Sequence, residues 1–441
     1  MFQNIKNLSI QAKKALIGVI IIKFATGFIT TWGILNIYYY CYFKSVKKQK
    51  QNTYNQKQLN PDLKIKEISL LITITTIPVG IASLFSLRIC RKYGYEPIIR
   101  ISVIISSCSL IVSSYQDTFY KFALFYMIIP IFLIGSCVMP VLYCLWSHFP
   151  KNTGSATGIA LASFGISGFL FLIITNKMVN PQNLKAEIDY QEGKQNYKLF
   201  GENVFKNIPQ MVFNVGLIQL ALNTFGCFFI SYNKNQQDDL ENNKQNIQQL
   251  IPNSIRSLKK DIFSQNFQLI YFSSFFINFI FIFLSLNFKI YGLTKINNDL
   301  FLTYLATIAS VLGSLSTIFW GFIVDKFTFV YIYPNMILCL IFSICLFPLL
   351  SSFKFLFALD FIIFSLVEKG IYTIVAPGLV QLFGMSVGAE LSVIKGTSFY
   401  AALFLVPIIQ IWLLLHFNYD QCIFFIGLSL FISYFMSYYI R

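Results

Sequence analysis

Long apolar stretches alternate with polar connectors along the whole chain of 441 residues. A helix needs about 20 predominantly apolar residues to span the hydrocarbon core of a bilayer, and the pattern predicts twelve such helices. The predicted spans are 15–42, 68–89, 98–116, 119–146, 155–176, 208–231, 267–291, 300–323, 329–350, 354–379, 391–415 and 419–440. We therefore expect an all-α membrane protein.

One polar segment divides these predicted spans into two sets of six. It is rich in Gln and Asn and carries charges of both signs, as a connector between two membrane-embedded halves does. We expect an N-terminal six-helix half at 1–232, a linker at 233–265 and a C-terminal six-helix half at 266–441. Two sets of equal size favour a pseudo-symmetric pair of repeats. The connectors 44–67 and 177–206 are predicted to be long polar loops.

Composition agrees with a membrane protein, because 56% of the residues are hydrophobic and only 12% are charged. The net charge of +16 is spread over many connectors, which favours contact with anionic lipid headgroups and argues against nucleic-acid binding. The sequence has no cluster of His, Cys, Asp or Glu with metal-ligand spacing, so we expect no metal and no cofactor. It has no Ser/His/Asp set within one layer, so we expect no enzymatic activity.

A short turn joins the second and third predicted helices of the C-terminal half. Its sequence, WGFIVDKF, contains Gly321, Asp325 and Lys326. The turn resembles a motif of the major facilitator superfamily, roughly G-x-x-x-D-[RK]-x-G-[RK]. The resemblance implies that the Asp325 carboxylate sits at a neighbouring helix N-terminus or meets a base, which closes one side of a transporter. The alternative is a polar turn without a gating role.

The matching turn of the N-terminal half reads SLRICRKYGYEP and keeps the motif less well. Lys92 and Gly94 match it, but Arg91 stands where the acid is expected. The resemblance places both turns, and therefore both chain termini, in the cytoplasm.

Three further stretches resemble the oxalate/formate-antiporter-like and monocarboxylate branch of the superfamily. They are WSHFPKNTGSATG, starting at Trp146, STIFWGFIVDK in the eighth predicted helix, and GIYTIVAPGLVQLFG in the tenth. The first stretch begins a run of small residues that suits close helix packing, and we expect it to contact the helix at 300–323. The glycines of this run are Gly154, Gly158, Gly165 and Gly168.

The same resemblance places the branch's two cationic substrate ligands. Its arginine falls at Thr317, and its lysine falls at Ser398, with Lys395 nearly one helical turn earlier. A hydroxyl cannot replace the bidentate fork of an arginine, so we expect a monocarboxylate held by Lys395 rather than a dicarboxylate. Thr317, Ser398 and Tyr400 are predicted to shape the site, although Tyr400 is equally consistent with packing.

Other charged residues also fall inside predicted spans, and Asp360, nearer the outer end of the tenth span, is expected at a solvated or pore-mouth position. Glu368 and Lys369 lie near mid-span, where an ionisable group costs on the order of 2.5–3.5 kcal/mol on insertion scales. We expect them to form an ion pair or to couple charge or protons. Lys23 is predicted either to snorkel to the headgroups or to be a cavity cation.

Together these features and the family resemblance imply a monomeric secondary transporter that moves a small organic anion, with a monocarboxylate as the expected substrate. It would work by alternating access, with proton coupling or exchange. The bilayer, a small-molecule substrate and protons are the expected partners, in a plasma or organelle membrane. Two alternatives stay open. One is a transporter of a neutral solute such as a sugar, amino acid or nucleoside, and the other is a receptor or scaffold that has lost transport.

Overall fold

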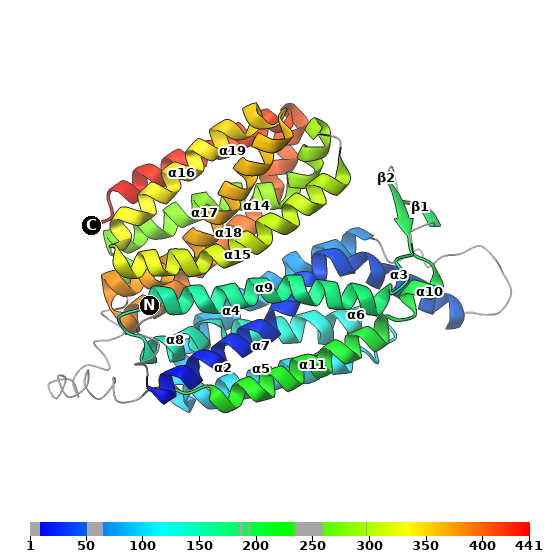
Figure 1. The fold of residues 1–441 in the computed structure, drawn as a ribbon, viewed down its shortest axis with the longest axis horizontal. Coiled ribbons are helices and arrows are strands. Elements are labelled where there is room, and N and C mark those ends of the chain that lie inside the picture. Colours follow the sequence, from blue (N-terminus) through cyan, green and yellow to red (C-terminus); the bar gives the residue numbers. More distant parts are fainter. Residues whose placement is uncertain are drawn as a thin grey trace. The chain divides into compact units, whose positions relative to one another are not determined.

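The computed structural model describes residues 9–50, 65–184, 188–192, 195–233, 258, 260–296 and 298–441. This part of the chain is almost entirely helical, and each of the twelve predicted spans corresponds to a long helix or a run of shorter ones (Figure 1). Among the described residues, ten helical segments are long and apolar enough to cross a membrane. The predicted all-α architecture is therefore confirmed.

The first predicted half contains the shorter elements. They are α2 (Ile10–Thr26), η1 (Gly27–Thr31), α3 (Trp32–Lys50), α4 (Ile65–Tyr93), α5 (Tyr95–Ser113), α6 (Phe119–Ala123), η2 (Leu124–Ile128), α7 (Ile129–Gly135), α8 (Val138–His148), α9 (Thr153–Val179), α10 (Glu202–Phe205) and α11 (Ile208–Phe229).

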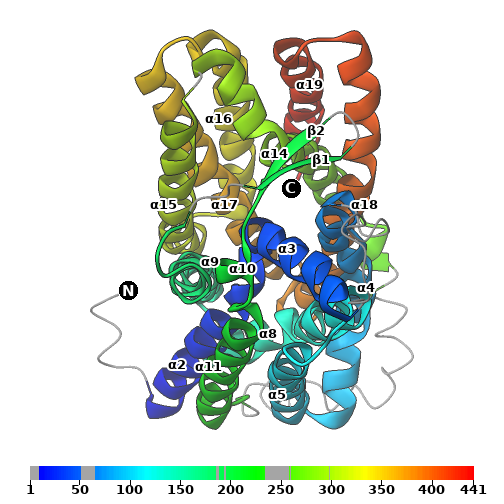
Figure 2. The ribbon, with the colours of Figure 1, turned by 90° about the vertical axis from the view of Figure 1, so that its right-hand side faces the viewer.

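The second predicted half consists of six long helices. They are α14 (Gln265–Ile296), α15 (Asp299–Lys326), α16 (Phe329–Leu350), α17 (Lys354–Phe383), α18 (Met385–His416) and α19 (Tyr419–Tyr438). Figure 2 shows α15, α16 and α17 running side by side, and α17 contacts both of the others.

The first predicted span is not one continuous helix, which corrects the prediction for 15–42. The 3₁₀ segment η1 separates α2 from α3. Gly27 disfavours the α-helix, and the hydroxyls of Thr30 and Thr31 donate to the carbonyls of Gly27 and Phe28 at 2.8 and 2.7 Å. Such local bonds compete with helical hydrogen bonding, so the helix tightens here.

The predicted loop at 177–206 contains a small β-hairpin. Strands β1 (Ile188–Glu192) and β2 (Gln195–Leu199) pair antiparallel, with Ile188 opposite Leu199. Figure 1 shows the hairpin beyond the ends of α3 and α10. It is anchored at its base, because Leu199 is buried and the ring of Phe200 lies 4.7 Å from that of Tyr38.

Contacts among the described residues divide the chain into two compact units. One contains residues of Met1–Val19, Val141–Gly165 and Ile230–Arg441, and the other contains residues of Ile20–Pro140 and Ile166–Phe229. This grouping does not follow the predicted halves, because the start of α9 packs on α15. The predicted linker at 233–265 lies mostly outside the described residues.

Candidate functional site

The carboxylate of Asp325 caps the N-terminus of α9. Its Oδ1 accepts a hydrogen bond from the amide of Gly154 and its Oδ2 accepts one from the amide of Ser155, both at 2.7 Å. The first amides of a helix have no partner within the helix and carry a partial positive charge. The carboxylate therefore occupies an anion-binding position at the N-terminus of α9. We call this contact the Asp325 cap.

Gln381 of α17 holds the turn that carries Asp325. Its side-chain amide donates to the carbonyl of Val324 at 2.7 Å, and its carbonyl accepts from the amide of Phe329 at 3.0 Å. One side chain thus satisfies the end of α15 and the start of α16. The sequence prediction did not include Gln381, although it lies in the predicted PGLVQLFG stretch.

Glycines bring α9 and α15 into backbone contact. A side chain at Gly154 would overlap Val324 and the Gly321 carbonyl, and one at Gly158 would overlap the Thr317 carbonyl. Gly321 in turn faces the Gly154 carbonyl. Helix pairs in membranes rely on such small residues because lipid gives no hydrophobic drive for their association.

The other two glycines of the run contact different elements. A side chain at Gly165 would overlap Ser314 of α15, whereas one at Gly168 would overlap Thr30 of η1. The predicted contact with the helix at 300–323 is therefore present at Gly154, Gly158 and Gly165, whereas Gly168 packs against η1.

We expect Gly158→Ala to destabilise the protein by about 1–3 kcal/mol, because the added methyl group overpacks a backbone contact. Gly396→Ala is the matched control, since a side chain there meets open space and alanine favours a helix by up to about 1 kcal/mol over glycine. Thermal unfolding of both variants in detergent measures the difference. Equal melting temperatures would mean that α9 and α15 do not need the close approach.

Thr317 lies in this helix contact. It is buried, and its hydroxyl lies 2.8 Å from the Gly158 carbonyl and 2.7 Å from the Ser314 carbonyl, so it donates to main-chain acceptors. We therefore leave Thr317 out of the proposed substrate site.

The turn of the N-terminal half differs from the Asp325 turn. Arg91 and Lys92 lie in the last turn of α4, where basic side chains complement the helix dipole. Gly94 alone links α4 to α5 with φ at +92°, a conformation that glycine adopts without strain. This turn offers basic groups where the other offers a carboxylate. Lys326, beside Asp325, is exposed.

Lys395 is the central residue of a polar cluster inside the C-terminal helices. Its side chain is 9% exposed, and no carboxylate lies within 4.0 Å of it among the described residues. Its ammonium lies 5.7 Å from the ring centroid of Tyr372 on α17, a cation–π distance. The hydroxyl of Tyr372 donates to Asn278 Oδ1 of α14 at 3.0 Å.

Two groups around Lys395 lack a hydrogen-bond partner. They are the hydroxyl of Ser398 and the Nδ2 amide group of Asn278, both buried. Ser398 lies three residues after Lys395 and so shares its side of α18. We call Lys395, Ser398, Tyr372 and Asn278 the Lys395 cluster. The prediction missed Tyr372 and Asn278, although Tyr372 follows Glu368 by one helical turn.

The predicted charge pair borders this cluster. Lys369 Nζ lies 3.7 Å from Glu368 Oε1, and the lysine is more exposed than the acid. Glu368 and Tyr372 share one face of α17, since they are four residues apart. The stem of Lys369 instead packs against Gly313 of α15. Tyr400 is rotated about 140° from Lys395 around α18 and packs on Phe399.

Lys23 of α2 belongs to the other compact unit. It is 7% exposed, and no carboxylate lies within 4.0 Å of it in the described part of the chain. This burial within the protein does not agree with the snorkelling interpretation.

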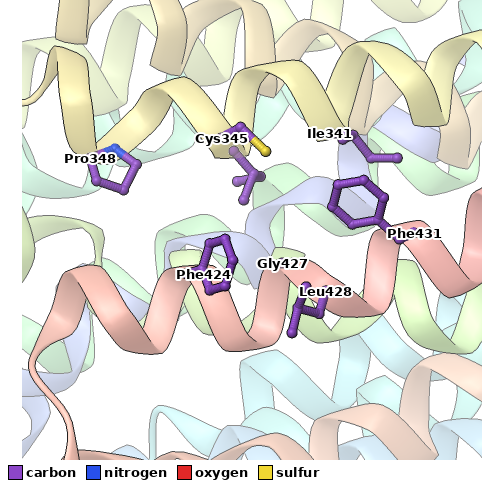
Figure 3. A pocket seen from close by; sticks show the side chains of 8 residues that line it. Ile341, Cys345, Pro348, Phe424, Gly427, Leu428 and Phe431 are labelled. Atoms are coloured by element: carbon purple, nitrogen blue, oxygen red, sulfur yellow. The ribbon is translucent and has the colours of Figure 1, made fainter.

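A pocket between α16 and α19 differs in character from the Lys395 cluster. Figure 3 shows it lined by apolar side chains that include Cys345, Phe424 and Phe431. It offers no polar group to an ion, and Phe424 and Phe431 are exposed on the outer side of these helices. We do not assign it to a polar substrate. The described residues also contain no group of three or more His, Cys, Asp or Glu that could hold a metal ion.

Comparison with known proteins identifies this arrangement. Residues 18–392 match the model of the Major Facilitator Superfamily. The chain belongs to the major facilitator superfamily. As a member, it is a multi-pass integral membrane protein with the superfamily's transporter fold. The match is to the superfamily as a whole, and the narrower branch stays a prediction.

Solved structures of one transporter share this fold. The proton:xylose symporter XylE bound to 6-bromo-6-deoxy-D-glucose aligns with a TM-score of 0.69 at 12% identity, over 98% of this chain and 95% of that one. A double-tryptophan XylE mutant aligns with a TM-score of 0.70 at 12% identity, over 97% and 94% of the two chains. This likeness shows the superfamily fold. No curated protein sequence matches the chain.

Proposed function

We propose that this superfamily member is a secondary active transporter of a small organic anion, with monocarboxylates as the first class to test. The two six-helix halves would work by alternating access, with proton coupling or exchange, and the Asp325 turn would face the cytoplasm together with both termini. The single observation that carries the proposal is the burial of Lys395 with no acidic partner within 4.0 Å in the described part of the chain.

An unpaired ammonium inside a membrane protein is costly. A carboxylate ligand removes this cost by supplying the missing negative charge. One lysine matches one carboxylate, and the nearby Lys369 already has an acidic partner, since its Nζ lies 3.7 Å from Glu368 Oε1. This favours a monocarboxylate over a dicarboxylate.

The groups without partners add a second requirement. The amide nitrogen of Asn278 and the ammonium of Lys395 are donors, and the Ser398 hydroxyl can donate as well. A ligand that satisfies them carries acceptor oxygens. Tyr372 contributes an aromatic face and fixes Asn278 through its hydrogen bond. Thr317 and Tyr400 are placed outside this proposed site.

Alternating access requires a contact that forms and breaks. The Asp325 cap joins the segment Val141–Gly165 to the C-terminal helices, and we propose that it holds one side closed. The glycine contact between α9 and α15 lets the two helices approach closely enough for this bond.

A neutral solute is the second candidate. The hydroxyl, amide and aromatic groups of Tyr372, Asn278 and Ser398 are suited to sugar hydroxyls, and the structural neighbour XylE is a xylose symporter. In that case Lys395 would contact a ligand oxygen without neutralising a charge.

A matched ligand pair separates the two candidates. The purified protein is unfolded by heat with a small monocarboxylate or with the corresponding amide, which has nearly the same shape and no charge. Binding at 100 times the dissociation constant stabilises the folded state by about 2.7 kcal/mol. We expect this stabilisation from carboxylates only. Equal stabilisation by both ligands would contradict the anion proposal.

A further inference from the structure

Asp360 of α17 is a buried acid that the Lys395 cluster does not use. Its residue is 6% exposed. Oδ1 accepts a hydrogen bond from the hydroxyl of Ser343 on α16 at 2.8 Å. Oδ2 is buried and has no hydrogen-bond partner. The sequence predicts a solvated or pore-mouth position near the outer end of the helix, whereas the structure places this acid in the protein interior.

Asp360 lacks a compensating cation in the part of the chain that the structure describes. Among the described residues, no lysine, arginine or histidine lies within 4.0 Å of its carboxylate, whether from α14, α15, α16 or α18. The charged groups on α17 itself are Lys354, six positions earlier, and the Glu368–Lys369 pair, eight and nine positions later. At about 1.5 Å per residue these lie roughly 9 Å and 12 Å or more along the axis.

The neighbouring contacts are apolar. The ring of Phe361 stacks on Phe288 of α14 at 3.8 Å, and the ring of Phe357 packs on Phe347 of α16 at 5.0 Å. An ionised carboxylate with one hydrogen bond is strongly disfavoured in such surroundings. The neutral, protonated acid avoids that cost.

Glu368, two turns away on the same helix, shows the contrast. Its Oε1 lies 3.7 Å from the ammonium of Lys369. The two membrane-embedded acids of α17 therefore have different partners, a lysine for Glu368 and a single hydroxyl donor for Asp360 among the described residues.

We propose that Asp360 is a proton-binding site that couples proton movement to transport. The inference rests on the proposed function, because it assigns the coupling proton of the same transporter. The proton adds to one carboxylate oxygen from water on one side and leaves to water on the other, and no electrons are transferred. Asp360 and Tyr372 belong to the same helix, so a shift of α17 against α16 that opens the Lys395 cluster also separates Asp360 from Ser343 and admits water.

Transport in proteoliposomes tests the coupling. Asp360→Asn keeps the shape and the hydrogen bond from Ser343 but cannot release a proton. With a labelled monocarboxylate, we expect the counterflow rate of this variant to stay within about twofold of the wild-type rate. Under an inward-directed proton gradient, we expect it to accumulate at least about tenfold less substrate than the wild type. Asp420→Asn, at an acid paired with Lys295, is the matched control and should accumulate normally. Gradient-driven accumulation by Asp360→Asn at the wild-type level would overturn the proposal.

Infrared spectroscopy tests proton binding without transport. The C=O stretch of a protonated carboxylic acid should be present in the wild-type protein, absent in Asp360→Asn and shifted in Ser343→Ala, which keeps the acid but loses its hydrogen bond. Identical spectra for wild type and Asp360→Asn would overturn the proton site. Absence of carboxylate counterflow in the wild type, with the infrared band present, would instead remove the proposed substrate.

Discussion

Lys395→Ala is expected to lower carboxylate uptake roughly 30-fold or more while the protein still inserts into the membrane. Removing one partner of a buried charge interaction costs about 2–5 kcal/mol, and each 1.4 kcal/mol corresponds to about a factor of ten. The loss arises because Lys395 is the cationic member of the Lys395 cluster, and alanine offers the substrate carboxylate no charge. Uptake of a labelled monocarboxylate into proteoliposomes, normalised to reconstituted protein, measures it.

Two further variants separate substrate binding from folding. Lys395→Met keeps most of the side-chain volume and removes a charge that is costly to bury, so its melting temperature should equal or exceed that of the wild type while its uptake is lost. Lys354→Ala changes an exposed lysine in the first turn of α17 and should transport normally. Full uptake by Lys395→Met would show that the substrate charge is bound elsewhere.

Asp325→Asn is expected to weaken the contact between the turn after α15 and the start of α9. Asparagine keeps one acceptor oxygen, but its side-chain NH2 then faces the second backbone N–H of the helix. Two donors cannot form a hydrogen bond with each other. A hydrogen bond to a charged group contributes about 1.5–3 kcal/mol, so exchange of the Gly154 and Ser155 amides with deuterium should rise roughly tenfold or more. Hydrogen–deuterium exchange of the peptide around these residues measures it.

Asp420→Asn is the matched control for Asp325→Asn. Asp420 also accepts two hydrogen bonds, from Tyr291 and Lys295, but it lies in α19. Its substitution should leave exchange at Gly154 and Ser155 unchanged. Slow exchange of these amides in Asp325→Asn, as in the wild type, would contradict the role given to the Asp325 cap.

The helices could be predicted from the sequence because a membrane span depends on a local pattern. A membrane span is recognised as a run of about 20 apolar residues. The contact of the Asp325 carboxylate with a helix N-terminus was one of the arrangements that the family resemblance implied. The spacing of Gly154 and Gly158 predicted a close helix neighbour, and the Thr317–Gly321 segment supplies it.

Features that depend on partners far along the chain were harder to predict. The family resemblance predicts that Thr317 shapes the substrate site, but its hydroxyl donates to the carbonyl of Gly158, 159 residues away. The role of Asn278 could not be predicted because a single polar residue in an apolar span forms no periodic pattern. Its place in the Lys395 cluster depends on the hydrogen bond from Tyr372, 94 residues later. The grouping of Val141–Gly165 with the C-terminal helices likewise depends on tertiary contacts.

Counterflow in proteoliposomes tests the central claim most directly. Vesicles loaded with unlabelled solute are diluted into labelled solute, using a panel of monocarboxylates, their amides, dicarboxylates and sugars at two pH values. We predict transient accumulation of at least one monocarboxylate and of none of the amides or sugars. Accumulation of a neutral solute that monocarboxylates do not inhibit would contradict the account.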